Sequence, residues 1–495
     1  MDIGDLMNQS GVGFGTSGAR GLAADMTDLV CHSYTAGFLQ YLLQTGQAHP
    51  GGRVALAGDL RPSTERILIA CAQASRDLGF EPLYAGRIPS PAVAAFGIAD
   101  AIPSLMVTGS HIPDDRNGIK FNLPTGEILK RDEQGIRAQS LEIPTGRFGP
   151  TGWFAPGAAA PLPPEEPGVL ADYIGRYLAF FPAGCLAGLR VGVYEHSSVA
   201  RDPLARVLEG LGAEIRRLGR SEHFIPVDTE AIRPEDHALA KEWAGDGGFD
   251  ALVSADGDGD RPLVSDEHGE WLRGDIAGIL CAHGLGVRAV ATPVSSNTAL
   301  ERSGWFEQVL RTRIGSPYVI EGMQALSAAG AGPVAGYEAN GGFLLQDPIE
   351  RDGRTLPALP TRDALIVAVT ILAAAAGRGV PVSRLVGDLP RRFTHSDRIK
   401  SFPTELSRSR LAALDSGDPQ RDRAAVEGIF GGHFGPVAAL DRTDGLRITF
   451  ASGEIAHLRP SGNAPELRAY TEADDPARAA QMNAICMQIL ATWRD

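Results

Sequence analysis

Cysteine is scarce in this sequence, and its spacing excludes two kinds of site. Only five cysteines occur in 495 residues, and they lie far apart at Cys31, Cys71, Cys185, Cys281 and Cys486. None forms a Cys-x-x-Cys pair, so the chain lacks the framework of a cysteine-bound metal site or of a disulfide-stabilised fold. This cysteine usage is typical of a reducing compartment, and we expect a cytoplasmic protein.

Long apolar runs and an excess of positive charge are also missing. The most apolar run, residues 364–377, falls short of the span that crosses a bilayer and predicts a buried helix instead. Residues 1–5 lack the basic start and apolar core of a signal peptide, and we expect none. The net charge of −14 argues against nucleic acid or an anionic membrane as a partner. The oligomeric state is left open.

Strand and helix patterns alternate through most of the chain. Apolar runs bounded by turn residues predict strands at 53–57, 81–84, 105–107, 189–194, 214–218, 249–254, 287–292, 309–313 and 334–336. Helical stretches lie between them, such as 63–79, 203–211 and 318–328. The alternation is typical of α/β domains in which helices cover mixed, mostly parallel sheets. Because 495 residues exceed the size of one hydrophobic core, we expect several such domains.

The end of the chain follows a different pattern. Residues 446–450 and 454–458 predict a β-hairpin, 466–471 another strand, and 476–493 a closing helix. We therefore predict three similar α/β domains and one α+β domain, at 1–165, 166–271, 272–390 and 391–495. In each α/β unit a strand ends in a polar, glycine-bearing loop. Ligands of open α/β sheets bind at the carboxyl ends of strands, so we expect the loops to meet at one central cleft.

The first of these loops follows the predicted strand at 105–107. Ser110 stands just past the strand end, where we expect its hydroxyl to be exposed, beside His111 and ten residues before Lys120. A nucleophilic serine, with charge or proton transfer supplied by the histidine and the lysine, is one interpretation. The alternative is an ordinary strand-to-turn connection, because the Pro-Asp and Asn-Gly pairs nearby favour turns.

The second loop contains three aspartates that alternate with glycine, Asp256, Asp258 and Asp260, followed by Arg261. Three adjacent anions repel one another unless a cation binds them, so the favoured interpretation is a metal site. An EF-hand is disfavoured, although Glu267 stands at its twelfth position, because Arg261 occupies the place that needs glycine. A solvated turn is the remaining alternative. Oxygen ligands favour Mg²⁺ over Zn²⁺.

Three further loops carry charged or polar groups. Arg20 follows a glycine-opened loop at 15–18, and Glu338 and Asn340 lie at 337–342. Residues 459–463 combine fixed positive charge, a hydroxyl, an amide and backbone N–H groups, which are the parts of a phosphate cradle. This is not a Walker A loop, since no Gly-Lys-Ser/Thr occurs there. Taken singly, these loops also fit a flexible N-terminal turn, a surface carboxylate and a hairpin turn.

In order and spacing the five loops resemble those of the α-D-phosphohexomutase family of phosphoglucomutases and phosphomannomutases. The resemblance extends from Gly15 to Arg468 and depends mainly on Ser110-His111-x-Pro113 and on the aspartate loop. It implies phosphoryl transfer between the C6 and C1 oxygens of a hexose phosphate, through a phosphoserine at Ser110. Hexose 1,6-bisphosphate would be the intermediate and activator. We expect mannose phosphate as the small-molecule substrate. The alternatives are a phosphoglucomutase or dual-specificity mutase, then a phosphoglucosamine mutase or a non-catalytic sugar-phosphate-binding relative.

The resemblance also implies a role for each matching residue. The Mg²⁺ ligands would be Ser110, Asp256, Asp258 and Asp260. The catalytic residues would be Ser110, Lys120 as general acid/base, Arg261, Arg20 and His111. The substrate-binding residues would be Glu338, Asn340, Arg313, Arg459, Ser461, Gly462, Asn463 and Arg468.

Several positions depart from the family pattern. Ile112 stands where the family has Asn, Asn340 where it has Ser, Asn463-Ala464 where it has Thr-Glu, and Arg313 where relatives often have Lys. None of these departures removes a charged catalytic group. We therefore expect them to affect the choice of sugar more than the activity.

Overall fold

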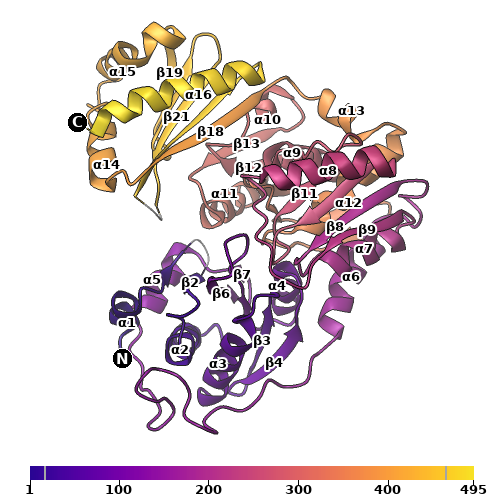
Figure 1. Ribbon diagram of the computed structural model, residues 1–495, viewed down its shortest axis with the longest axis vertical. Coiled ribbons are helices and arrows are strands. Elements are labelled where there is room, and N and C mark those ends of the chain that lie inside the picture. The colour runs from indigo at the N-terminus through magenta and orange to yellow at the C-terminus, as the bar shows by residue number, and fades with distance from the viewer. Residues whose placement is uncertain (16–17, 463–464, 495) are drawn as a thin grey trace.

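The computed structural model describes residues 1–15, 18–462 and 465–494. Four large sheets and a two-stranded ribbon follow one another in chain order. In Figure 1 the indigo N-terminal sheet lies at the bottom, and the yellow C-terminal sheet stands at the top. Each large sheet falls within one of the four predicted ranges, which confirms three α/β units followed by an α+β unit. The domain boundaries themselves stay a prediction.

The first sheet has the strand order β1-β2-β6-β5-β3-β4, with β7 beside β6. Strands β4, β3 and β5 are parallel, and β6, β2 and β1 continue the sheet antiparallel. The elements are α1 (Ile3–Ser10), β1 (Gly13–Phe14), β2 (Gly18–Leu22), α2 (Asp28–Gln44), β3 (Arg53–Gly58), α3 (Thr64–Asp77), β4 (Glu81–Gly86), α4 (Ser90–Ala99), β5 (Ser104–Val107), β6 (Arg116–Leu123), β7 (Gly126–Glu127) and α5 (Lys130–Arg137). The Ser110 loop joins the neighbouring strands β5 and β6, and this pairing sets Lys120 opposite Met106.

The second and third sheets are built alike. Each has three parallel strands and one antiparallel edge strand, in the orders β11-β10-β8-β9 and β13-β12-β14-β15. The unit built around the second sheet contains α6 (Gly168–Phe180), β8 (Arg190–His196), α7 (Arg201–Gly210), β9 (Glu214–Arg220), α8 (Pro234–Gly247), β10 (Ala251–Ala255) and β11 (Pro262–Val264). The third contains α9 (Gly274–Leu285), β12 (Ala289–Pro293), α10 (Ala299–Arg302), β13 (Gln308–Thr312), α11 (Ser316–Ala328), β14 (Val334–Tyr337), β15 (Phe343–Leu345), the ribbon β16 (Ile349–Arg351) and β17 (Arg354–Leu356), α12 (Ala364–Arg378) and α13 (Val382–Gly387).

The aspartate loop and the Glu338 loop occupy equivalent places in these two sheets. The aspartate loop joins β10 to β11, and the Glu338 loop joins β14 to β15. In both, a fully buried parallel strand ends and an antiparallel edge strand begins. The Ser110 loop likewise joins the buried parallel strand β5 to the antiparallel strand β6, although β6 is not an edge strand. The three loops therefore leave the carboxyl ends of equivalent strands, which is where α/β sheets bind ligands.

The fourth sheet is antiparallel, with the order β18-β22-β21-β20-β19. Its elements are β18 (Phe393–Lys400), α14 (Thr404–Ala412), α15 (Pro419–Phe434), β19 (Val437–Asp441), β20 (Leu446–Phe450), β21 (Ile455–Pro460), β22 (Glu466–Ala473), α16 (Pro476–Ala491) and a final 3₁₀ turn (Thr492–Arg494). The predicted hairpin, third strand and closing helix are all present.

The hydrophobic cores separate the last unit from the others. One continuous core cluster includes Ala57, Val193 and Val290, from the first three sheets. The cluster that contains Phe450 and Leu458 belongs to the fourth unit alone. The predicted buried helix is α12, and its N-cap Asp363 accepts a hydrogen bond from the backbone of Leu365. Over the part of the chain that the structure describes, no helix is long and apolar enough to cross a membrane.

Candidate active site

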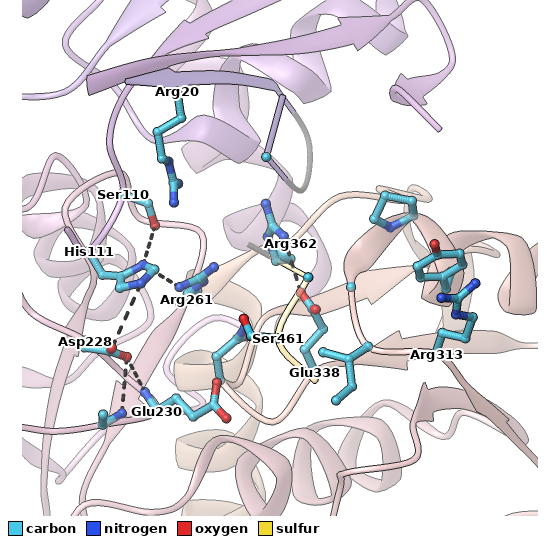
Figure 2. A pocket seen from close by; sticks show the side chains of 18 of the residues that line it. Arg20, Ser110, His111, Asp228, Glu230, Arg261, Arg313, Glu338, Arg362 and Ser461 are labelled. Atoms are coloured by element: carbon cyan, nitrogen blue, oxygen red, sulfur yellow. Dashed lines mark hydrogen bonds and ion pairs between the residues drawn. The ribbon is translucent and has the colours of Figure 1, made fainter. Parts of the chain in front are cut away.

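Loops from all four large sheets line one cleft of about 710 Å³. Figure 2 shows it from close by, with Ser110, His111 and Arg261 grouped together and Glu338 and Arg313 further along. The predicted residues that line the cleft are Arg20, Ser110, His111, Lys120, Arg261, Arg313, Glu338, Asn340, Arg459, Ser461, Gly462 and Arg468. The three aspartates lie buried behind Ser110. Asn463 lies outside the described residues, as does Ala464.

Ser110 is buried, with 1% of its surface accessible, which corrects the expectation of an exposed hydroxyl. Its φ of 56° lies in the left-handed region, a conformation that costs a residue other than glycine about 1–3 kcal/mol. The backbone N–H of Ser110 donates to Thr108 Oγ1 at 2.7 Å. Its Oγ donates to Asp256 Oδ2 at 2.6 Å. The strained loop thus packs the hydroxyl against the aspartate loop of the second sheet.

Arg61, which the sequence analysis did not single out, holds the Ser110 loop in place. Its guanidinium donates to the carbonyl oxygens of Ser110 (2.9 Å), Ile112 (2.6 Å), Pro113 (2.6 Å) and Arg116 (3.1 Å), and to Asp59 Oδ2 (3.0 Å). The loop passes so close that a Cβ at Gly109 would lie 2.6 Å from Arg61 Cζ, so only glycine fits there. The Phe224 ring of the second unit lies over the guanidinium, 3.9 Å from its carbon.

The side chains of Asp256, Asp258 and Asp260 fit a metal site. The three residues are at most 2% exposed, and each offers a carboxylate oxygen within 4.8 Å of the others. In residues 1–15, 18–462 and 465–494, Oδ1 of Asp258 and Oδ1 of Asp260 find no hydrogen-bond partner. Burial and the neighbouring carboxylates raise the pKa of Asp256 well above its ordinary value. Unpartnered buried oxygens in a cluster of like charges suit a cation that prefers oxygen ligands.

Lys120 and Arg20 bring positive charge to this end of the cleft. Lys120 Nζ donates to Asp258 Oδ2 at 2.6 Å and to Asp260 Oδ2 at 2.5 Å. Burial opposes the charge on Lys120, but the two carboxylates outweigh burial, and the pKa of Lys120 is raised above its ordinary value. The amine is therefore an ammonium. The Arg20 guanidinium has no ion pair with any described residue, and burial and the charge of Arg261 lower its pKa to about 10. A half-buried arginine beside like charges suits an anionic ligand.

His111 orients Arg261 next to Ser110. Arg261 Nη1 donates to His111 Nδ1 at 2.6 Å. His111 Nδ1 also lies 3.2 Å from Ser110 Oγ. Arginine only donates, so Nδ1 carries no proton. Burial and the charge of Arg261 lower the pKa of His111 to about 3, and the ring is neutral. Its Nε2 lies 4.0 Å from Asp228 Oδ2, on a loop of the second unit (Figure 2).

The fourth sheet adds a stripe of three arginines to the cleft. Arg398, Arg468 and Arg459 are direct cross-strand neighbours on β18, β22 and β21, and all three line the cleft. Like charges opposite one another destabilise a sheet. Glu466 pairs with Arg468 at 3.0 Å, and Asp444 pairs with Arg459 at 2.8 Å. The remaining positive charge suits a phosphate dianion.

The loop of the third sheet places its carboxylate beside Arg362. Glu338 is 6% exposed, and its Oε2 accepts a hydrogen bond from Arg362 Nη1 at 3.3 Å. The side chain of Asn340 accepts at Oδ1 from the backbone N–H of Gly342 at 2.9 Å, so its amide oxygen is used inside the loop. Arg313 lies over the Tyr318 ring at 4.9 Å.

The sequence analysis missed several residues that shape this site: Arg61, Asp228, Glu230, Arg362 and Arg398. Asp228 and Glu230 lie between β9 and α8, in a stretch with no glycine-bearing loop signal. Arg362 directly precedes the helix start that Asp363 caps, so the polar turn before the apolar run 364–377 was its available signal. Arg398 had none, because it is a charged residue on an edge strand.

A buried serine, a carboxylate cluster and an arginine stripe around one cleft define an enzyme that transfers phosphoryl groups. The sequence matches the phosphoglucomutase/phosphomannomutase family in its α/β/α domain I (residues 11–146), its α/β/α domain III (273–393) and its C-terminal domain (409–488). The chain belongs to this family, as the sequence resemblance predicted, and it is a phosphohexomutase.

Individual relatives agree with this assignment. A phosphomannomutase of Salmonella muenchen is 44% identical over 488 residues, which cover 97% of this chain and 95% of the relative. A phosphomannomutase of Sinorhizobium fredii is 43% identical and covers 96% of this chain and 98% of its own length. The crystal structure of a putative phosphomannomutase from Thermus thermophilus has the same fold, with a TM-score of 0.73 at 20% identity, covering 97% of this chain and 99% of that one.

Proposed function

We propose that this chain is a phosphomannomutase, which moves a phosphoryl group between the C6 and C1 oxygens of mannose phosphate. One observation carries the proposal: Ser110 Oγ, bonded to Asp256 at 2.6 Å, and the arginine stripe of the fourth sheet share one cleft. One end suits the reacting phosphoryl group, and the other suits the phosphate that does not react. The two relatives named phosphomannomutase favour mannose as the sugar.

The first half-reaction starts from phosphorylated Ser110. A free sugar hydroxyl attacks the phosphorus, the bond from phosphorus to Ser110 Oγ breaks, and hexose 1,6-bisphosphate is formed. Lys120, held as an ammonium, gives a proton to the departing Oγ and regains one from the attacking hydroxyl. In the second half-reaction Oγ attacks the other phosphorus, and the proton transfers run in reverse.

Charge neutralisation is the main demand of this chemistry. Asp256, Asp258 and Asp260, with an oxygen of phosphorylated Ser110, would hold Mg²⁺, which when bound supplies positive charge against the transferring phosphoryl group. Arg20 and Arg261 add fixed positive charge, and His111 keeps Arg261 beside Oγ. The other phosphate would be held by the loop of the fourth sheet, with Arg459, Ser461, Gly462, Asn463 and Arg468.

The sugar must bind in two opposed orientations, since either end has to reach Ser110. Glu338 would therefore read the C3 and C4 hydroxyls, which stay near the middle when the ring turns over. Those hydroxyls are common to mannose and glucose, so we expect both phosphates to be turned over. Asn340 is the residue expected to bias the choice between them. Selectivity would then stay within about a hundredfold in kcat/KM, or roughly 2.7 kcal/mol.

Steady-state kinetics with mannose 1-phosphate and glucose 1-phosphate test the proposal, together with intact-mass analysis for one phosphoryl group on Ser110. The expected result is turnover of both sugars, with mannose phosphate preferred. A gap above about a thousandfold would mean that the site reads C2 directly, and the dual-substrate argument would fail. Turnover of neither sugar by protein that carries the phosphoserine would overturn the phosphomannomutase proposal and favour the phosphoglucosamine mutase alternative.

A further inference from the structure

Arg362 lies where three units of the molecule meet. It is 3% exposed and stands directly before α12. Its Nε donates to Asp260 Oδ2 at 2.9 Å, and its Nη1 donates to Glu338 Oε2 at 3.3 Å. Its Nη2 lies 3.9 Å from Glu127 Oε1. One guanidinium thus contacts the aspartate loop of the second sheet, the sugar loop of the third and the end of β7 in the first. Figure 2 shows Arg362 and Glu338 directed toward each other.

The contact with Asp260 occupies one oxygen of that carboxylate and leaves the other open. Oδ2 of Asp260 accepts from both Arg362 and Lys120. Oδ1 is left without a hydrogen bond among the described residues, with Arg261 Nε 3.7 Å away. A carboxylate held at one oxygen cannot rotate freely, so the other oxygen keeps its direction. Groups that orient a metal ligand in this way are as much part of a metal site as the ligands themselves.

The stem of Arg362 fills a space that the sugar loop leaves open. A Cβ at Gly342 would lie 2.5 Å from Arg362 Cδ and 2.7 Å from its Cγ. No real Cβ atom tolerates such contacts, so a side chain at position 342 and the present path of Arg362 exclude each other. The guanidinium is held further by Glu127, which itself accepts from Thr361 Oγ1 at 2.7 Å and from Ser316 Oγ at 2.9 Å.

We propose that Arg362 is a positioning residue that couples cation binding at Asp260 to sugar-phosphate binding at Glu338. The proposal rests on the proposed function, which places the cation and the sugar at those two carboxylates. When either ligand orders its carboxylate, the shared guanidinium is already in place for the other. The second ligand then binds to a more ordered site and loses less conformational entropy. By linkage, each ligand raises the affinity for the other by the same factor.

Isothermal titration of the full-length, unphosphorylated protein with MgCl₂ tests this coupling without turnover. We compare titrations without and with saturating mannose 1-phosphate. For the wild type we expect the sugar phosphate to tighten Mg²⁺ binding at least about fivefold. Arg362→Met keeps the apolar stem and removes the guanidinium. It should weaken Mg²⁺ binding about ten- to a hundredfold and reduce the linkage to less than about twofold.

Gly342→Ala gives a second, independent perturbation, since it displaces the Arg362 stem and leaves the charge in place. It should also weaken the linkage, and it keeps the test valid if Arg362→Met does not fold. Arg392→Met is the matched control. Arg392 is 4% exposed and pairs with Glu472 and Asp474 at the edge of the fourth sheet, outside the cleft lining. Its loss should leave Mg²⁺ affinity and linkage unchanged.

The outcomes separate the two hypotheses. If the wild type shows the linkage and the Arg362 and Gly342 variants keep it, the coupling proposal fails and the mutase proposal stands. If Arg392→Met loses as much as Arg362→Met, the effect is general destabilisation, and the coupling proposal fails as well. If the wild type binds no Mg²⁺, or binds it equally with and without mannose 1-phosphate, the coupling proposal fails. The mutase proposal is decided separately by the kinetics above, because its Mg²⁺ site includes an oxygen of phosphorylated Ser110.

Discussion

Replacing Arg61 with lysine is the sharpest test of how the fold positions the reacting serine. Arg61 uses its guanidinium to hold four backbone carbonyls of the Ser110 loop and the Asp59 carboxylate. A lysine offers at most three donors from one nitrogen, so at least two of these acceptors lose the hydrogen bond from this side chain. The Pro113 carbonyl keeps a bond from Arg116 N–H, and Asp59 Oδ2 keeps one from Thr108 Oγ1. Each buried acceptor left alone costs about 1–3 kcal/mol. We therefore expect Arg61→Lys to lower the free energy of unfolding by about 2–5 kcal/mol.

The same substitution should affect catalysis beyond stability. Without the guanidinium the left-handed conformation at Ser110 relaxes, and a shift of about 1 Å in a reacting group costs about a hundredfold in rate. We expect kcat to fall about ten- to a hundredfold, with KM little changed, because Arg61 contacts no cleft-lining side chain of the fourth sheet among the described residues.

Urea unfolding and steady-state kinetics on the same samples measure both effects. Arg66→Lys is the matched control: Arg66 donates to the carbonyl oxygens of Met26 and Ala23 and has no hydrogen bond to residues 108–116 in the described part of the chain. It should lower stability modestly and leave kcat unchanged. A kcat for Arg61→Lys within about threefold of the wild type would refute the positioning argument.

Three further predictions follow from the site. Ser110→Ala should lower kcat to less than about a thousandth of the wild-type value, because the phosphoryl carrier is lost. The free energy of unfolding should change by only about 1 kcal/mol. Residual turnover of about a tenth of the wild-type rate would contradict the phosphoserine role. Arg459→Ala should lower kcat/KM about ten- to a hundredfold through loss of a charge-assisted phosphate contact, and an unchanged value would reduce that loop to a turn. Burial lowers the pKa of His196 and of His457 to about 4, and each ring donates from Nε2 to a carbonyl while its Nδ1 has no partner among the described residues. The unfolded chain therefore binds more protons than the folded chain between about pH 4 and 6.5. Urea unfolding should show that the free energy of unfolding falls by about 2 kcal/mol per histidine from pH 7.5 to 5. His457→Gln should reduce this loss, and the exposed His49→Gln should not.

The architecture was predictable because buried parallel strands form short apolar runs. Every residue of β5 and of β10 is buried, and each run ends abruptly at polar residues. That change in composition marks the carboxyl end of a strand, where the ligand-binding loops start. The location of Ser110 and of the aspartates could be predicted on this basis. The fourth unit was predictable for another reason. Apolar and polar residues alternate along its strands, and the hairpin and closing helix pack in a core of this unit alone.

The environment of the loops was not predictable in the same way. Ser110 was expected to be exposed because it stands just past a strand end, but its partner Asp256 comes from a different sheet, 146 residues away. Arg61 stands directly before Pro62, and nothing in the sequence marks a role for it. Its role depends on four carbonyl groups, and carbonyl groups carry no signature in a sequence. Sequence patterns therefore indicate which strand end carries a loop, but the contacts between units decide its conformation.

Asn340, the departure from the family pattern in the sugar loop, shows the same dependence on contacts, and the structure changes its interpretation. Read one at a time, Asn340 looked like a residue that reaches toward the sugar. In the structure its side-chain oxygen accepts from Gly342 N–H at 2.9 Å, and its backbone carbonyl accepts from Thr229 Oγ1 at 2.7 Å. Gly342 in turn leaves room for Arg362, which reaches Glu338 and Asp260. A change at Asn340 would therefore alter the path of the whole loop before it altered any single contact with the C2 hydroxyl. The choice of sugar is better sought in the joint conformation of Asn340, Gly342 and Arg362 than in any one of them.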